Sequence, residues 1–304
     1  MEKSQRNKTI DLTAGQVDKY LALCAHSAPE NPDGCLDKVI VGDTESIAAR
    51  LPEGIVDLMI ADPPYNLSKN YNGSVFNRVD DAEYEKYTRA WLESVLPCLK
   101  KGASVYVCCD WRSSNVIGSV LGDYLCVRNR ITWQRDKGRG AAKNWKNSME
   151  DIWFATNGED YKFNLDAVKQ KKRVIAPYRL DGEARDWQED ESGKYRYTCP
   201  SNFWDDLTVP YWSMSENTVH PTQKPEKLLA KLILASSDEG DLVFDPFLGS
   251  GTTAVTAKKL GRRYLGIERE QKYCAIAAYR LEKADADKRI QGYEDGVFLS
   301  RNQG

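Results

Sequence analysis

Histidine is scarce in this chain of 304 residues and occurs as His26 and His220 alone. A histidine-based zinc site or a Ser-His-Asp triad therefore has almost no material, and no metal site is expected. The eight cysteines are scattered without a C-x-x-C pair, which favours buried thiols in a reducing compartment over disulfides. An apolar run of about 18 residues and a signal-peptide pattern are also lacking. We therefore expect a cytoplasmic protein that does not enter a membrane.

The segment Asp62-Pro63-Pro64-Tyr65 follows directly on the apolar run 55–61. Proline fixes φ and donates no backbone hydrogen bond, so this turn cannot fold back into the ladder of a sheet. A strand that ends here presents a carboxylate and two rigid carbonyl groups, and Tyr65 adds a flat ring. A structural turn tolerates proline but has no need of an acid and an aromatic ring at fixed positions. The combination suits a planar ligand that carries an exocyclic amine.

A second pattern lies near the other end of the chain. Residues 241–245 are expected to form a buried strand, and residues 246–253 a glycine-rich turn that opens a helix. The helix stops at Gly261, and a further strand, 264–267, ends at Glu268. Strand, glycine turn, helix, strand and terminal acid are typical of a nucleoside-binding unit, in which the acid accepts hydrogen bonds from ribose hydroxyls.

Two common ligands fit this glycine turn poorly. A phosphate-binding P-loop needs lysine after its last glycine, but Gly251 is followed by Thr252 and Thr253. A dinucleotide fingerprint expects an apolar strand leading straight into the first glycine, although Ala254 satisfies its spacing. The acid at Asp245 would repel a pyrophosphate and favour a cationic amino-acid group. The turn therefore favours S-adenosylmethionine over NAD.

Three segments of the chain resemble motifs of DNA amino-methyltransferases. Because the catalytic motif comes first and the cofactor motif last, their order resembles that of the β class. Residues 62–65 are similar to the catalytic motif of that family, residues 245–253 to its S-adenosylmethionine motif, and residues 220–225 to the segment before the latter. The resemblance covers roughly residues 38–280. It implies S-adenosyl-L-methionine as cofactor and double-stranded DNA as substrate. The implied fold class is α/β and Rossmann-like, with a mostly parallel sheet, helices on both faces and an irregular target-recognition insertion.

The resemblance also assigns roles to residues. The expected catalytic residues are Asp62, Pro63, Pro64 and Tyr65. The expected cofactor-binding residues are Asp43, Thr222, Lys224, Asp245, Pro246, Phe247, Gly249, Ser250, Gly251, Thr252, Thr253 and Glu268. Asp62 and the Pro63 carbonyl would accept hydrogen bonds from the amine and stabilise the positive charge that grows on its nitrogen. The base would be flipped out of the duplex and stacked on Tyr65. Asp43 is expected near the cofactor adenine or as the N-cap of the next helix.

The target base and the partners leave alternatives. Adenine N6 is favoured over cytosine N4, because cytosine-modifying members more often carry serine at the position of Asp62. RNA carries the same amines and is an alternative substrate. A DNA-binding module without catalysis is an alternative function. Many relatives have a His-Glu pair where this chain has Met149-Glu150. A homodimer and a cognate restriction endonuclease are open possibilities.

The chain is predicted to divide into a catalytic core and additions. The predicted parts are an N-terminal extension, 1–37, a catalytic domain, 38–159 and 218–285, a target-recognition insertion, 160–217, and a C-terminal tail, 286–304. Residues 66–80 are expected to form a mobile loop over the active site. Asp62 and Asp245 both end predicted parallel strands, so the two motifs should meet at one crevice.

The formal net charge of −2 conceals two basic stretches. Basic residues far outnumber acids in 128–146 and again in 161–179, with aromatic residues between them. Two such stretches in succession predict a surface that contacts DNA phosphates. The candidate contacts are Arg135, Lys137, Arg139, Lys143, Lys146, Lys171, Lys172 and Arg173. The acidic stretch 181–191 is expected to point away from DNA or to accept cytosine amines.

Overall fold

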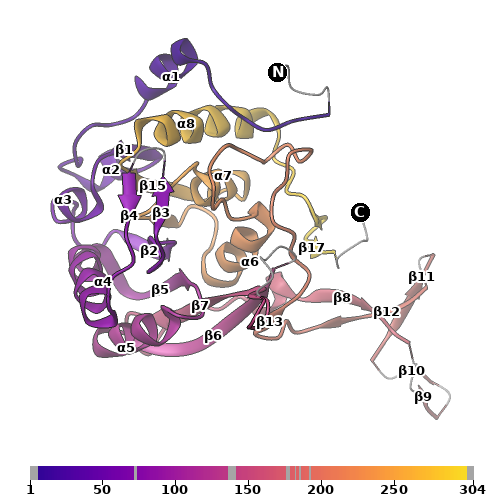
Figure 1. Ribbon diagram of the computed structural model, residues 1–304. Helices are drawn as coiled ribbons and strands as arrows, with labels where there is room; N and C mark the ends of the chain where they lie inside the picture. The colour runs from indigo at the N-terminus through magenta and orange to yellow at the C-terminus, as the bar shows by residue number, and fades with distance from the viewer. Residues whose placement is uncertain are drawn as a thin grey trace.

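An eight-stranded sheet forms the centre of the computed structural model (Figure 1). The structure describes residues 6–71, 74–135, 142–175, 179–181, 183–184, 186–191 and 193–299. The strand order is β1-β15-β14-β2-β5-β7-β6-β13. The strands are β1 (Lys38–Val41), β2 (Val56–Ala61), β5 (Leu99–Cys109), β6 (Cys126–Gln134), β7 (Met149–Thr156), β13 (Phe203–Trp204), β14 (Leu242–Asp245) and β15 (Arg263–Glu268). Neighbouring strands are parallel except for the two pairs that involve β7, which confirms the mostly parallel sheet.

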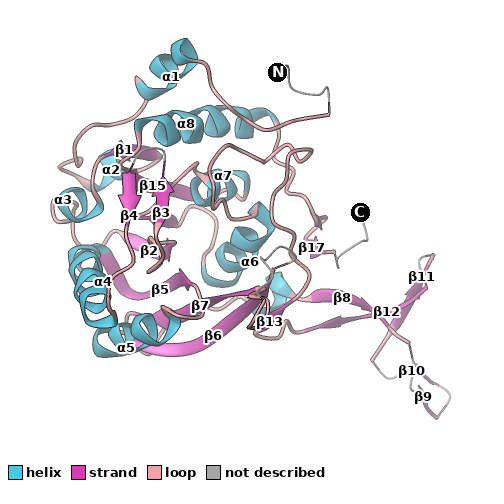
Figure 2. Cartoon of the chain, viewed as in Figure 1, coloured by secondary structure: helices cyan, strands magenta, loops and turns pink. Residues whose placement is uncertain are grey.

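Helices cover both faces of this sheet, as predicted (Figure 2). One face carries α6 (Glu226–Ser236), α7 (Thr252–Lys259) and α8 (Gln271–Ala286), with α1 (Ala14–Leu21) packed on α8. The other carries α3 (Thr44–Ala48), α4 (Asp81–Val95) and α5 (Ser114–Tyr124). A short helix, α2 (Pro32–Cys35), precedes β1. Among the described helices, none has the length and apolar character needed to cross a membrane.

Alternate residues of the central strands feed two separate cores. In β2, Leu58 and Ile60 lie in the core under α6 to α8, whereas Met59 and Ala61 lie in the core under α3 to α5. A sheet buried on both faces favours strands that are apolar almost throughout, and in β2 every residue except Asp57 is apolar and buried.

The pairing of β2 with β14 positions the two sequence motifs. These strands are parallel neighbours, with Phe244 opposite Met59. Asp62 and Asp245 therefore lie at the same edge of the sheet, the edge at which ligands bind in open α/β folds. Between β2 and α4, a hairpin of β3 (Lys69–Tyr71) and β4 (Ser74–Phe76) stands beside this edge (Figure 1).

The insertion has more regular pairing than its sequence suggests. An antiparallel ribbon projects from the body of the molecule (Figure 1). Its strands are β8 (Gln170–Arg173), β11 (Gln188–Asp190) and β12 (Gly193–Thr198), with β9 (Arg179–Leu180) and β10 (Glu183–Ala184) paired nearby. From the C-terminal part of the chain, β17 (Val297–Phe298) pairs with β8, and β16 (Tyr293–Glu294) pairs with β17. No residue of β8, β11 or β12 is fully buried, so the ribbon has no apolar period that a sequence pattern could reveal.

A buried ion cluster ties the insertion to α6. Lys231 Nζ lies 2.6 and 2.7 Å from the two carboxylate oxygens of Asp206. Lys227 Nζ lies 3.0 Å from the same carboxylate and donates to the backbone carbonyl of Leu299 at 2.5 Å. The three charged side chains are between 2% and 10% exposed. Neutralising Asp206 would therefore leave two buried ammonium groups without this counter-ion.

We predict that Asp206→Asn destabilises the fold by about 3 kcal/mol, because removing one partner of a buried ion pair has a cost of this order. The neighbouring Asp205 is exposed, so Asp205→Asn serves as the matched control and should leave the stability unchanged. The midpoint of urea unfolding measures both variants. Equal midpoints for the two would contradict the role given to the cluster.

Candidate functional site

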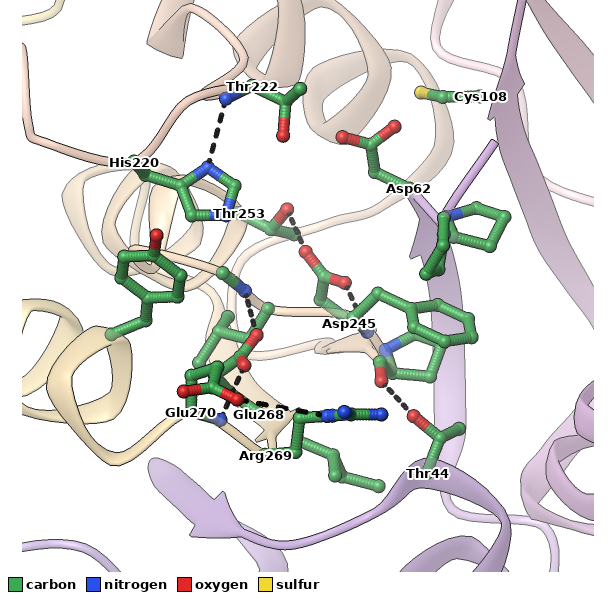
Figure 3. A pocket seen from close by; sticks show the side chains of 18 of the residues that line it. Thr44, Asp62, Cys108, His220, Thr222, Asp245, Thr253, Glu268, Arg269 and Glu270 are labelled. Atoms are coloured by element: carbon green, nitrogen blue, oxygen red, sulfur yellow. Dashed lines mark hydrogen bonds and ion pairs between the residues drawn. The ribbon is translucent and has the colours of Figure 1, made fainter. Parts of the chain in front are cut away.

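A cavity of about 350 Å³ lies at the edge of the sheet where β2, β14 and β15 end. This volume falls within the range of small-molecule sites, roughly 300–1,000 Å³. The predicted catalytic and cofactor-binding residues that line it are Asp43, Asp62, Pro63, Pro64, Tyr65, Thr222, Lys224, Asp245, Pro246, Phe247, Gly249, Ser250, Thr252, Thr253 and Glu268. Figure 3 shows Asp62, Thr222 and Asp245 pointing into the space between their elements. Segments remote in the sequence thus share one cavity.

The turn after β14 is built around the carboxylate of Asp245. Its two oxygens accept hydrogen bonds from the backbone N–H of Phe247, at 2.9 Å, and from the hydroxyl of Thr253, at 2.5 Å. Asp245 is buried, and this burial, together with the negative charges of Asp62 and Glu268, raises the pKa of Asp245 to about 7. A ligand cation placed here would stabilise the ionised carboxylate.

Glycine is needed at two positions of this turn for different structural reasons. Gly251 has a φ of +86° and packs on α8, where an added Cβ would lie 2.6 Å from the Cβ of Ala277. Gly251 does not line the cavity; it allows α7 to start close to α8. Gly249 has a φ of +55° and does line the cavity, where an added Cβ would lie 3.1 Å from His220 Nε2. Both positions favour glycine because side chains disfavour positive φ.

Glu268 ends β15 and turns back toward the glycine turn. Its Oε2 accepts from the backbone N–H of Gly249 at 2.9 Å, and its Oε1 from that of Glu270 at 2.7 Å (Figure 3). Burial raises the pKa of Glu268 above its ordinary value. The carboxylate is therefore a fixed acceptor on the cavity wall, suited to hydroxyl groups of a ligand.

Asp43 caps α3 and also lines the cavity. Its Oδ1 accepts from the backbone N–H groups of Glu45, at 3.1 Å, and Ser46, at 3.4 Å. The next residue, Thr44, donates its hydroxyl to the carbonyl of Pro246 at 2.5 Å and so links α3 to the turn after β14. Both expectations for Asp43 are therefore compatible with its position.

Both oxygens of the Asp62 carboxylate are hydrogen-bonded. The hydroxyl of Tyr65 donates to Oδ1 at 2.8 Å, and Lys224 Nζ donates to Oδ2 at 2.6 Å. Although burial opposes it, the negative charges of Asp62 and Glu150 raise the pKa of Lys224, which keeps its ammonium group charged. Lys224, expected to bind the cofactor, thus lies on the carboxylate of the catalytic turn.

Glu150 completes this cluster and was not predicted as a site residue. Its Oε2 lies 3.2 Å from the Tyr65 hydroxyl and 3.4 Å from Lys224 Nζ, and its Oε1 pairs with the guanidinium of Arg135. Glu150 stands near the start of β7, which runs antiparallel to its neighbours. The start of β7 therefore lies at the edge where the parallel strands end. The signal in the sequence is the acid of the Met149-Glu150 pair.

Cys108 is a further cavity residue that the sequence did not single out. It stands at the end of β5 with its thiol beside Asp62 (Figure 3). Burial raises the pKa of Cys108 well above its ordinary value, and the negative charge of Asp62 adds to this effect. The side chain is therefore a neutral thiol and serves as an apolar part of the cavity wall.

The candidate DNA contacts fall into groups. Lys137 and Arg139 lie outside the described residues. Lys143, Lys146, Lys172 and Arg173 are exposed to solvent. Arg135 is paired with Glu150, and Lys171 Nζ lies 2.6 Å from Asp190. Two of these cations are therefore already engaged within the protein.

The acidic stretch lies on the same ribbon as the basic residues. Asp190 pairs with Lys171, and Asp186 lies 2.9 Å from Arg196. These acids neutralise part of the ribbon's positive charge. Within the described part of the ribbon, the exposed cations Lys172 and Arg173 on β8 form no ion pair.

Comparisons with known proteins support one family. A family model described as DNA methylase matches residues 56–279. The chain is 34% identical over 253 residues to the DNA adenine methyltransferase YhdJ of Escherichia coli (strain K12), covering 81% of this chain and 83% of that protein. It is 31% identical over 300 residues to the type II methyltransferase M.BglII of Bacillus subtilis, covering 92% and 78%.

Solved structures agree with the fold. The M1.HpyAVI–SAM complex aligns with a TM-score of 0.53 at 25% identity, covering 80% of this chain and 98% of that one. The cytosine-N4-specific PvuII DNA methyltransferase aligns with a TM-score of 0.61 at 17% identity, covering 86% and 93%, and shows the fold alone. The family model spans the strands that carry both motifs, and the two relatives match over most of their length. This chain belongs to the DNA methylase family.

Proposed function

We propose that this protein transfers a methyl group from S-adenosyl-L-methionine to the exocyclic N6 of adenine in duplex DNA. The observation that carries the proposal is the presence of Asp62 and Asp245 on one cavity. Adenine is supported by Asp62 at the start of the catalytic turn and by YhdJ, which is named a DNA adenine methyltransferase.

The cavity residues fit the cofactor. Asp245 is a buried carboxylate that forms no ion pair with any described residue, so it would hold the cofactor's ammonium group. Glu268 would accept hydrogen bonds from the ribose hydroxyls, and Asp43, which also lines the cavity, would lie near the adenine. A structure of M1.HpyAVI, which has the same fold, is a complex with SAM. When bound, the cofactor would supply an electrophilic methyl group, whose bond to sulfur would break as the bond to the amine nitrogen forms.

Asp62 and the carbonyl of Pro63 act on the target amine. The nitrogen is a weak nucleophile because its lone pair is delocalised into the base ring. Hydrogen bonds from the amine to these two acceptors draw the lone pair out of conjugation. They also stabilise the positive charge that develops on nitrogen, and Asp62 accepts the surplus proton before it passes to solvent. Tyr65 orients Asp62 through its hydroxyl and offers its ring to the base.

The target base reaches this cavity by leaving the duplex. The cavity lies at the edge of a sheet between two layers of helices, so a base that remains stacked cannot enter it. The exposed residues Lys143, Lys146, Lys172 and Arg173 supply contacts to DNA phosphates. The ribbon within 160–217 projects from the body of the molecule (Figure 1), and this position supports a role in target recognition.

The proposal extends to the setting of the enzyme. M.BglII of Bacillus subtilis carries the designation type II methyltransferase, which supports an enzyme that modifies DNA in a bacterial cell.

Incubation with duplex DNA and methyl-labelled cofactor tests the function directly. We predict labelled N6-methyladenine after digestion of the DNA to nucleosides. Labelled N4-methylcytosine would show that the target base is cytosine and not adenine. Label in RNA and none in DNA would overturn the proposal.

We predict that Asp62→Ala lowers kcat by at least about 100-fold, the usual loss when a group that stabilises transition-state charge is removed. Cofactor binding, measured by calorimetry, should stay within about twofold of the parent protein. Undiminished turnover by Asp62→Ala would refute amine activation by this carboxylate.

Cofactor affinity should depend on pH through Asp245. Its pKa of about 7 means that the carboxyl is protonated below pH 7 and ionised above it. The ionised form attracts the ammonium group, so the dissociation constant should fall about tenfold from pH 6 to pH 8. Asp245→Asn should bind more weakly at pH 8 and lose this dependence. An unchanged slope in Asp245→Asn would assign the effect to another group.

A further inference from the structure

The catalytic carboxylate carries a competing cation. Lys224 Nζ lies 2.6 Å from Asp62 Oδ2, and only 9% of its side chain is exposed. An ammonium group at this distance neutralises much of the negative charge on the carboxylate. The proposed reaction needs that charge, because positive charge develops on the amine that Asp62 holds. A cation fixed in place on Asp62 would therefore oppose methyl transfer.

A second carboxylate lies within reach of the same ammonium group. Glu150 Oε2 is 3.4 Å from Lys224 Nζ, so a displacement of about 1 Å would bring it to hydrogen-bond distance. The Tyr65 hydroxyl bridges the same two acids, 2.8 Å from Asp62 and 3.2 Å from Glu150. Two donors are thus shared between two acids, with both donors closer to Asp62.

Arg135 explains why Asp62 is the preferred partner in this structure. Its guanidinium pairs with Glu150 Oε1 and neutralises part of the charge that would attract Lys224. Arg135 follows the end of β6, and its backbone N–H donates to the carbonyl of Ser148 at 2.7 Å. Its Nε is buried without a hydrogen-bond partner among the described residues, so the side chain retains an unused donor.

We propose that Lys224 is a positioning residue that occupies Asp62 in the absence of substrate and shifts to Glu150 when the target amine binds. Glu150 is the second positioning residue, because it receives the ammonium group. The shift leaves Asp62 Oδ2 free for the amine and moves the positive charge away from the reacting nitrogen. This inference rests on the proposed function. It adds Lys224, just before α6, and Glu150, in β7, to the residues that act with the catalytic turn.

The effect of combining two substitutions tests the shift. Glu150→Gln removes the negative charge that would attract the ammonium group, so Lys224 stays on Asp62 and the single-turnover rate should fall about 100-fold, with unchanged cofactor affinity. Adding Lys224→Met to this variant removes the competing cation as well. The double variant should therefore react at least about tenfold faster than Glu150→Gln alone. A merely structural role predicts that the second substitution lowers the rate further, and that result would overturn the proposal.

Lys100→Met is the matched control, because Lys100 Nζ pairs with Asp57 at 2.7 Å away from the cavity. Its rate should equal that of the parent protein. Absence of DNA methylation by the parent protein would refute the proposed function. An active parent protein whose double variant is slower than Glu150→Gln would refute the shift alone.

A crystal structure of the unaltered protein with duplex DNA and an unreactive cofactor analogue gives an independent test that needs no variant to fold. Lys224 Nζ should lie nearer to Glu150 Oε2 than to Asp62 Oδ2, the reverse of the present order. The present order, with a target adenine in the cavity, would overturn the proposal.

Discussion

The parallel pairing of β2 with β14 is the constraint on which the site depends. It places Asp62 and Asp245, far apart in the chain, at the ends of neighbouring strands. The prolines after Asp62 and the glycines after Asp245 then keep the backbone from continuing the ladder, so both carboxylates remain at the cavity. The helices on both faces exclude water from the strands below, and burial raises the pKa of Asp245.

The two ends of the cavity differ in whether their acidic side chains are paired with cations of the protein. Asp245 is buried and Glu268 is partly buried, and both accept hydrogen bonds from neutral hydroxyl or backbone N–H groups, so a positive charge on the ligand would stabilise these carboxylates. At the other end, Asp62 and Glu150 are matched by Lys224 and Arg135. The first arrangement suits a cationic cofactor that stays bound. The second is balanced in charge and suits a neutral amine, and the proposed shift of Lys224 to Glu150 would free the negative charge of Asp62 as that amine becomes positive.

Much of this architecture is visible in the sequence, because apolar runs that end in acids mark parallel strands. The ranges expected for β2, β14 and β15 agree closely with the structure, and the cofactor turn follows from Gly249, Gly251 and Glu268. Glu150 was not predicted as a site residue because β7 runs antiparallel to its neighbours, and the sequence does not indicate which strand is antiparallel. The ion-pair partners of Lys171 and Lys224 were not predicted, because ion pairs between remote segments leave no local pattern in the sequence.

The pairing of β17 with β8 gives the end of the chain an unexpected importance. Phe298 is buried, and β17 lies against the projecting ribbon, while Leu299 accepts a hydrogen bond from α6. The ribbon is therefore braced from two directions, by the segments on either side of it and by residues more than a hundred positions later. Exchange of the ribbon between family members would consequently require the matching last strands to be transplanted with it.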